Sequence, residues 1–124
     1  METSKRTMEP FQIEIIKEEL VLKLSHENLK LMNREQFKMF GINLFKWLDE
    51  LRKSGLRKDD LEQCINEIYY IQSDHFDEDL LFEERIYVIT NEIISFCASP
   101  FFWDISLEDY LRKWEGFFEY NKEL

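Results

Sequence analysis

Apolar residues recur three and four positions apart through most of this sequence, a spacing typical of helices that bury one face. The clearest stripe starts at Phe37 and repeats at helical intervals as far as Leu51. Comparable stripes follow in three later segments. Together they predict an all-α protein, a compact antiparallel bundle of about four to five helices. The predicted core comprises Phe37, Phe40, Leu44, Leu48, Ile65, Ile68, Ile86, Ile89, Ile93, Leu111 and Trp114.

Capping and turn-forming residues set the predicted ends of these helices. Asn33 begins one of them, because Gln36 three positions later completes a capping box. Gly55 ends that helix, since glycine accepts the left-handed conformation common after a helix. The other predicted N-caps are Asp59 or Asp60, Asp77 and Ser106. We expect helices over residues 11–31, 34–54, 60–73, 78–98 and 106–120. For the first of them, a break at residue 25 is an alternative.

The segment 11–24 is compatible with two structures. Ile13, Ile16, Leu20 and Leu24 repeat at helical spacing, whereas Phe11, Ile13 and Ile15 alternate with polar residues as in a strand. A small hairpin turning at 17–19 is therefore the alternative to a helix. Because no Gly or Asn stands at the would-be turn, the helix is the preferred prediction.

Composition is typical of a folded, helical protein. The chain has 124 residues, 44% of them hydrophobic, and only three Gly and two Pro. We expect one helical domain over residues 1–124, frayed at 1–9. Cys64 and Cys97 fall on apolar helical faces, where free cysteine behaves as a small hydrophobe. No stretch is long and apolar enough for a signal peptide or a membrane span, so the expected location is cytoplasmic.

The charge is distributed unevenly along the chain. Residues 1–62 hold 12 Lys or Arg and 12 Asp or Glu, whereas residues 63–124 hold 4 and 14, so the second half carries the whole net charge of −10. Such a field repels nucleic acid and anionic membranes and attracts basic proteins. The alternative is that the acidic surface only keeps the protein soluble.

Catalytic and metal-binding patterns are missing from the sequence. His26 and His75 have no His or Cys at ligand spacing, and the acidic stretch 77–79 lacks the central Gly and distant Glu of a calcium loop. Gly-rich phosphate loops, nucleophile elbows and zinc signatures do not occur. We therefore expect that the protein is not an enzyme and that it binds neither a metal nor a cofactor.

The stretch 73–110 is the predicted partner-binding region. An acidic cluster opens it, and the aromatic run 101–103 stands between two acid-rich segments. Protein interfaces are commonly anchored by aromatic residues within a polar rim. Each feature also has a structural explanation. Acidic residues stabilise a helix N-terminus, which accounts for Glu78 and Asp79 better than for Asp74, and the aromatic side chains can close the end of the bundle.

Three stretches carry a family resemblance: the helix opening at 33–37, the run 56–64 and the acidic turn 77–80. Their helix order and acidity resemble the small helical immunity proteins with which bacteria neutralise their own nuclease toxins, especially the colicin D type, whose toxin cleaves tRNA. The likeness covers about two thirds of the chain. The helix around Trp114 departs from that family's pattern.

The resemblance implies an acidic inhibitor that occludes the basic cleft of a toxin nuclease, with carboxylates in the place of RNA phosphates. Trp103 or Tyr110 would anchor the contact. The alternative is a helical regulator, adaptor or phage-encoded inhibitor that binds another basic protein. The expected partner is a basic protein, neither nucleic acid nor membrane, and the oligomeric state is open. The predicted partner-binding residues are Asp74, Asp77, Glu78, Asp79, Glu83, Trp103, Asp104, Glu108 and Tyr110.

Overall fold

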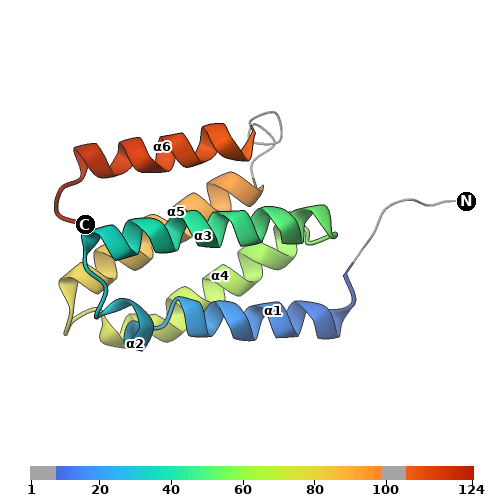
Figure 1. Cartoon of the computed structure of the whole chain (residues 1–124). Coiled ribbons are helices and arrows are strands. Elements are labelled where there is room, and N and C mark those ends of the chain that lie inside the picture. Colours follow the sequence, from blue (N-terminus) through green and yellow to red (C-terminus); the bar gives the residue numbers. More distant parts are fainter. Residues whose placement is uncertain (1–7, 99–105) are drawn as a thin grey trace, which may run out of the picture.

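The computed structural model of the protein describes residues 8–98 and 106–124. That part of the chain contains helices and no strand, so the all-α prediction is confirmed, and the segment 11–24 is helical (Figure 1). Glu9, within the segment expected to fray, is the N-cap residue of the first helix, and residues 1–7 lie outside the described part. The elements are α1 (Pro10–Lys23), α2 (His26–Leu29), α3 (Arg34–Lys53), α4 (Lys58–Gln72), a 3₁₀ turn η1 (Ser73–His75), α5 (Leu80–Ala98) and α6 (Leu107–Tyr120).

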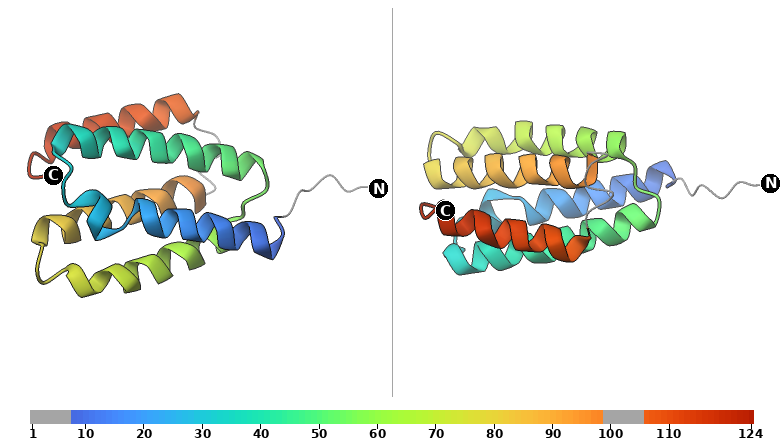
Figure 2. Two further views of the ribbon diagram at one scale, coloured as in Figure 1. Left: turned by 60° about the horizontal axis from the view of Figure 1, so that its bottom comes forward. Right: turned by 90° about the horizontal axis from the view of Figure 1, so that it is seen from above.

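The long helices lie side by side and form a bundle (Figures 1 and 2). The helices α4 and α5 form an antiparallel hairpin joined through η1, and α6 runs antiparallel along α3. A contact between α3 and α5 joins the two pairs, and α1 packs on α4. Successive long helices run in opposite directions, so the predicted antiparallel order is observed.

Several helix ends form where local sequence predicts them. Asn33 Oδ1 accepts a hydrogen bond from the Gln36 amide, and Gln36 Oε1 accepts one from the Asn33 amide, both at 2.8 Å. Ser106 Oγ accepts a hydrogen bond from the Asp109 amide at 3.2 Å. After α3, Gly55 adopts a φ of 113°, and the next residue's amide donates to the Leu51 carbonyl at 3.0 Å. This is the hydrogen-bond pattern of a glycine-terminated helix.

Two predicted N-caps are wrong. Helix α4 begins at Lys58 after Arg57, so Asp59 and Asp60 lie in its first turn, where carboxylates still meet the positive end of the helix dipole. Helix α5 begins at Leu80, and Asp79 Oδ1 accepts the hydrogen bond from the Phe82 amide at 3.0 Å. The cap is therefore Asp79 rather than Asp77, because η1 and the turn after it delay the start of the helix.

The predicted core is buried, except that Phe40 and Leu111 are half-buried against it. Between α3 and α6 the packing is aromatic: Trp114 meets Phe37 and Phe45 edge-on, and its Nε1 donates to the Lys38 carbonyl at 3.0 Å. Gly41 lies directly beneath the Trp114 ring, which a Cβ at that position would overlap. The two helices approach closely because position 41 has no side chain.

We predict opposite effects for the same substitution at two helical glycines. Gly41→Ala should lower the free energy of unfolding by about 1–3 kcal/mol, because the new methyl group forces the Trp114 ring aside. Gly116→Ala should raise it by about 0.5–1 kcal/mol, since open space surrounds that position and alanine favours the helix. Urea unfolding followed by circular dichroism measures both. Equal effects at the two positions would contradict the packing of Trp114 on Gly41.

Candidate functional site

The acidic cluster lies at one end of the bundle, where three segments of the chain meet. These are α2 with the linker that follows it, η1, and the first turns of α5 (Figure 1). Leu124 lies at the same end and is buried. We call this region the acidic end and define its exposed acidic residues as Asp74, Asp77 and Glu78.

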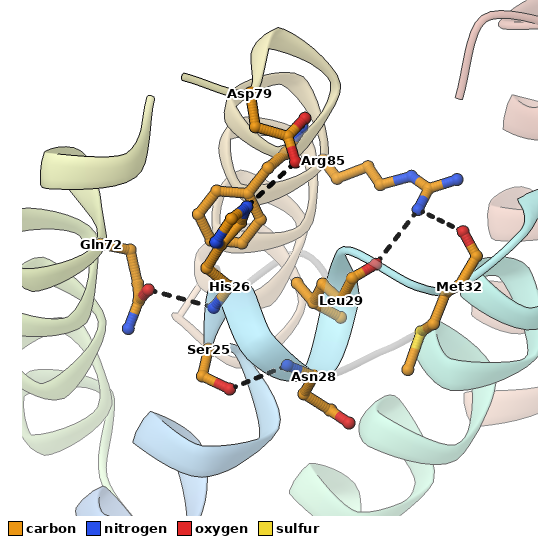
Figure 3. Close-up of polar contacts among 9 residues, drawn as sticks. Ser25, His26, Asn28, Leu29, Met32, Gln72, Asp79 and Arg85 are labelled. Atoms are coloured by element: carbon orange, nitrogen blue, oxygen red, sulfur yellow. Dashed lines mark hydrogen bonds and ion pairs between the residues drawn. The ribbon is translucent and has the colours of Figure 1, made fainter. Parts of the chain in front are cut away.

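His26 connects the three segments of the acidic end (Figure 3). Its backbone amide donates to Gln72 Oε1 at 3.2 Å, and its Nε2 lies 3.0 Å from Asp79 Oδ2. The His75 ring stacks on the His26 ring with centroids 4.6 Å apart, and Phe82 meets His26 edge-on at the same distance. The network fixes α2 against α4, η1 and α5.

The buried Arg85 side chain joins segments at the same end of the bundle. Its side chain is only 3% exposed, and its guanidinium carbon lies 4.8 Å from the Phe37 ring centroid. Nη1 donates to the Met32 carbonyl at 2.9 Å, whereas Nε and Nη2 donate to the Leu124 carbonyl at 3.1 and 2.6 Å. Burial lowers the pKa of Arg85 and the nearby Asp79 opposes that shift. The Arg85 guanidinium therefore binds groups inside the protein.

Both carboxylate oxygens of Asp79 are engaged within the protein. Burial by itself would raise the pKa of Asp79, but the hydrogen bonds from the Phe82 amide and His26, with the charge of Arg85, hold it below its ordinary value. Asp79 is thus ionised at neutral pH. Asp79 is one of the predicted partner-binding residues, but its carboxylate caps α5 and contacts His26 within the protein.

The structure divides the predicted binding surface between the two ends of the bundle. Asp74, Asp77 and Glu78 are exposed at the acidic end, and Glu83 is half-buried beside them. Glu108 is exposed in the first turn of α6, at the opposite end (Figure 1). The length of α5, about 27 Å at 1.5 Å per residue, separates the two groups. Residues 74–84 and 108–109 therefore do not form one continuous surface.

Tyr110 is a core residue, which corrects its predicted role as an exposed anchor. Its side chain is 1% exposed, its ring packs edge-on against Phe45, and its hydroxyl donates to Glu92 Oε2 at 2.5 Å. It faces α3 and α5 because the apolar stripe of α6 points inward. Trp103 and Asp104 lie outside the described residues, as does the rest of the aromatic run 101–103.

Exposed apolar side chains lie beside the acidic cluster and were not predicted from the sequence. Leu80 is 73% exposed and Tyr87 is 56% exposed, and Leu81 is also exposed. Positions 80, 84 and 87 share one face of α5, opposite the buried stripe that contains Ile86 and Ile89. Helical periodicity could have found this face. The contact between His26 and His75 could not have been found that way, because it joins residues far apart in the sequence.

Further features of the described residues concern metal ligands, cavities and the cysteine thiol. No group of three His, Cys, Asp or Glu among them could hold a metal ion. The cleft between α2 and α5, lined in part by Leu81 and Phe82, encloses about 40 Å³, and a larger pocket between α3 and α6, lined in part by Arg34 and Lys38, encloses about 610 Å³. Cys64 is buried, and burial raises the pKa of its thiol. Within the described ranges, none of the helices is long and apolar enough to cross a membrane.

Comparison with protein-family models, with curated proteins and with solved structures gives no match for this chain.

We predict that Asp79 contributes to stability in two separable ways. Asp79→Ala should lower the free energy of unfolding by about 0.5–2 kcal/mol through loss of the N-cap, whereas Asp79→Asn keeps a capping side chain and should cost less. The folded-state pKa of Asp79 is lowered, so its charge stabilises the fold above the unfolded-state pKa, and that contribution disappears as the pH falls through the folded-state pKa.

Denaturant unfolding at several pH values between about 7 and 3 tests the charge contribution. The wild-type protein should lose more stability over this range than Asp79→Asn does. Parallel pH dependences for the two proteins would show that the charge of Asp79 contributes nothing to stability.

We predict that the Arg85 side chain contributes strongly to the stability of the fold through its contacts at the acidic end. Arg85→Met should lower the free energy of unfolding by about 2–4 kcal/mol, because the carbonyl groups of Met32 and Leu124 lose a charged donor. Arg112→Met is the matched control, since Arg112 is exposed and its ion pair with Asp109 should contribute less than about 1 kcal/mol. Thermal unfolding of both variants decides, and similar losses would refute the role of Arg85.

Proposed function

We propose that this protein is an acidic inhibitor that binds a basic protein partner through the acidic end. In the specific form that we favour, it is a bacterial immunity protein that neutralises a cognate nuclease toxin in the cytoplasm by occluding the toxin's active-site cleft. The observation that carries the proposal is the charge of residues 59–98, which make up the α4–α5 hairpin after its first residue, Lys58. Between residues 59 and 98 the chain has eleven Asp or Glu and a single Arg. That Arg is the buried Arg85.

Helix capping does not account for the whole acidic cluster. Asp79 alone provides the side-chain cap of α5. Asp74, Asp77 and Glu78 are exposed and make no hydrogen bond or ion pair with the described residues. They are therefore available to an external cation, and the exposed lysine of the hairpin, Lys58, begins α4 at the opposite end of the bundle.

A nuclease suits such a surface because its substrate cleft must be basic to hold RNA phosphates. A negative surface is attracted into such a cleft at long range and excludes the nucleic acid once bound. The three carboxylates of the acidic end would take the place of phosphates. The charge of this surface supports a basic partner, and the resemblance to nuclease-immunity proteins supports a nuclease.

Apolar anchors stand next to these carboxylates. Leu80 and Tyr87 are exposed on one face of α5, and Leu81 is exposed next to Leu80 in the first turn. Interfaces commonly combine an apolar centre that governs residence time with a polar rim that governs encounter. Tyr87 takes the anchoring role that the sequence suggested for Tyr110. The network around His26 and Arg85 holds the surface in place before binding, which lowers the entropic cost of association.

The test begins with identification of the partner by pull-down and mass spectrometry, followed by surface plasmon resonance at low and high salt. Asp77→Lys/Glu78→Lys should slow association about tenfold or more at low salt, and the effect should shrink as salt rises, because the Debye length falls from about 10 Å at 0.1 M to about 3 Å at 1 M. Tyr87→Ala should act mainly on the dissociation rate.

The matched control is Asp59→Lys/Glu108→Lys. It makes the same charge change at exposed positions at the opposite end of the bundle, and it should leave the association rate nearly unchanged. If both double variants slow association equally, net charge alone is responsible and the acidic end is not the binding site. An RNA-cleavage assay with the captured partner then separates a nuclease inhibitor from an adaptor.

A further inference from the structure

Helix α1 is apolar on two opposite faces. Ile16, Leu20 and Leu24 are buried on its inward face, whereas on its outward face Phe11, Ile15 and Leu22 are 65%, 55% and 70% exposed. At about 100° per residue, these three exposed side chains fall within about 40° of one another and stand opposite Leu20. A helix at the surface normally presents polar residues on its outward face, and one that is apolar all round is normally covered. The outward face of α1 is therefore a candidate contact surface.

The charges on this face are acidic. Glu14, Glu18 and Glu19 are exposed among or beside the three apolar side chains. The two lysines of α1 point along its flanks toward other helices. Lys17 Nζ lies 3.0 Å from Glu67 on α4, and Lys23 Nζ lies 5.0 Å from the Trp47 ring centroid on α3. Each lysine also has a longer contact with an acid of α1, Glu14 at 3.6 Å or Glu19 at 4.0 Å.

A groove lies on the flank of α1 that faces α4. The groove encloses about 460 Å³ and is lined by Lys17, Asn66, Glu67, Tyr70 and Ile71. Tyr70 and Ile71 are both exposed there. Figure 2 shows α1 and α4 side by side along the bundle, so a rod-shaped partner can lie along them. This surface runs along the side of the bundle, apart from the carboxylates of the acidic end.

Charge decides which occupant this face favours. A second copy of the chain would bring the same three glutamates against each other, between two molecules that each carry a net charge of −10. An anionic lipid surface is repelled for the same reason. A helix that has its own apolar stripe bordered by Lys or Arg meets both features, because its stripe covers Phe11, Ile15 and Leu22 and its cations face the glutamates.

We propose that the outward face of α1, with the adjoining groove, is a second interaction surface that docks a basic amphipathic helix of another protein. The apolar contact gives the affinity, and the glutamates set the charge of the partner and its orientation. The acidic end and its partner are not needed for this contact.

The probe for this surface is a fluorescein-labelled synthetic peptide of 18 Leu and Lys residues that forms a basic amphipathic helix. The control peptide has the same composition in an order without an apolar stripe. By fluorescence anisotropy, the wild-type protein should bind the amphipathic peptide at least about tenfold more tightly than the control. Ile15→Gln/Leu22→Gln should weaken binding by about tenfold or more, whereas Leu31→Gln, at an equally exposed leucine outside α1, should change it less than about twofold.

Charge variants separate this surface from the acidic end. Glu14→Gln/Glu18→Gln should weaken peptide binding and reduce its salt dependence, whereas Asp77→Lys/Glu78→Lys should leave the affinity within about twofold. The reverse result, or equal binding by wild-type protein and Ile15→Gln/Leu22→Gln, would overturn the proposal. Melting curves of the variants should match the wild type because the substituted side chains are exposed.

Other occupants of the face would be detected by two further measurements. Light scattering that shows a wild-type dimer and an Ile15→Gln/Leu22→Gln monomer would identify a second copy. Co-sedimentation of the wild type, but not of that variant, with neutral phospholipid vesicles would identify a membrane surface. Either result would refute the proposed partner, and neither would affect the proposed role of the acidic end.

Discussion

The buried guanidinium of Arg85 is the interaction on which one end of the bundle depends. A charge removed from water is destabilising unless hydrogen bonds replace its hydration. Here those bonds come from the linker after α2 and from Leu124, so the guanidinium joins both segments to α5. Asp79 lies close enough to interact with this charge, and its carboxylate also contacts His26 on α2. The segments that carry the acidic end are thereby held in one arrangement.

The same interaction shapes the electrostatics of the surface. Arg85 is the single Lys or Arg between positions 59 and 98, and because it is buried, no exposed Lys or Arg stands in that stretch. The α4–α5 hairpin is left with an acidic surface that contains exposed leucine and tyrosine side chains. The outward face of α1 repeats this combination on the side of the bundle. Both surfaces are suited to basic partners, and they differ in the apolar groups that would anchor them.

Much of the fold could be predicted because its signals are local. The stripe from Phe37 to Leu51, the exchange of hydrogen bonds between Asn33 and Gln36, and the glycine stop at Gly55 each depend on neighbours within one or two helical turns. The start of α5 was predicted less well, because several acidic residues in a row can serve as its cap. Asp79 is chosen by the length of η1 and by His26, which approaches from α2.

The sequence by itself determined the helical class, most helix ends, most of the core and the concentration of acid in the second half of the chain. Periodicity, capping and charge are properties of the chain before it folds. Only the tertiary structure decided that Tyr110 is buried, that His26 stacks on His75, and that Asp77 and Glu108 stand at opposite ends of the bundle. Those outcomes depend on which helices lie side by side and in which direction each runs, and that choice is made by packing between residues far apart in the chain.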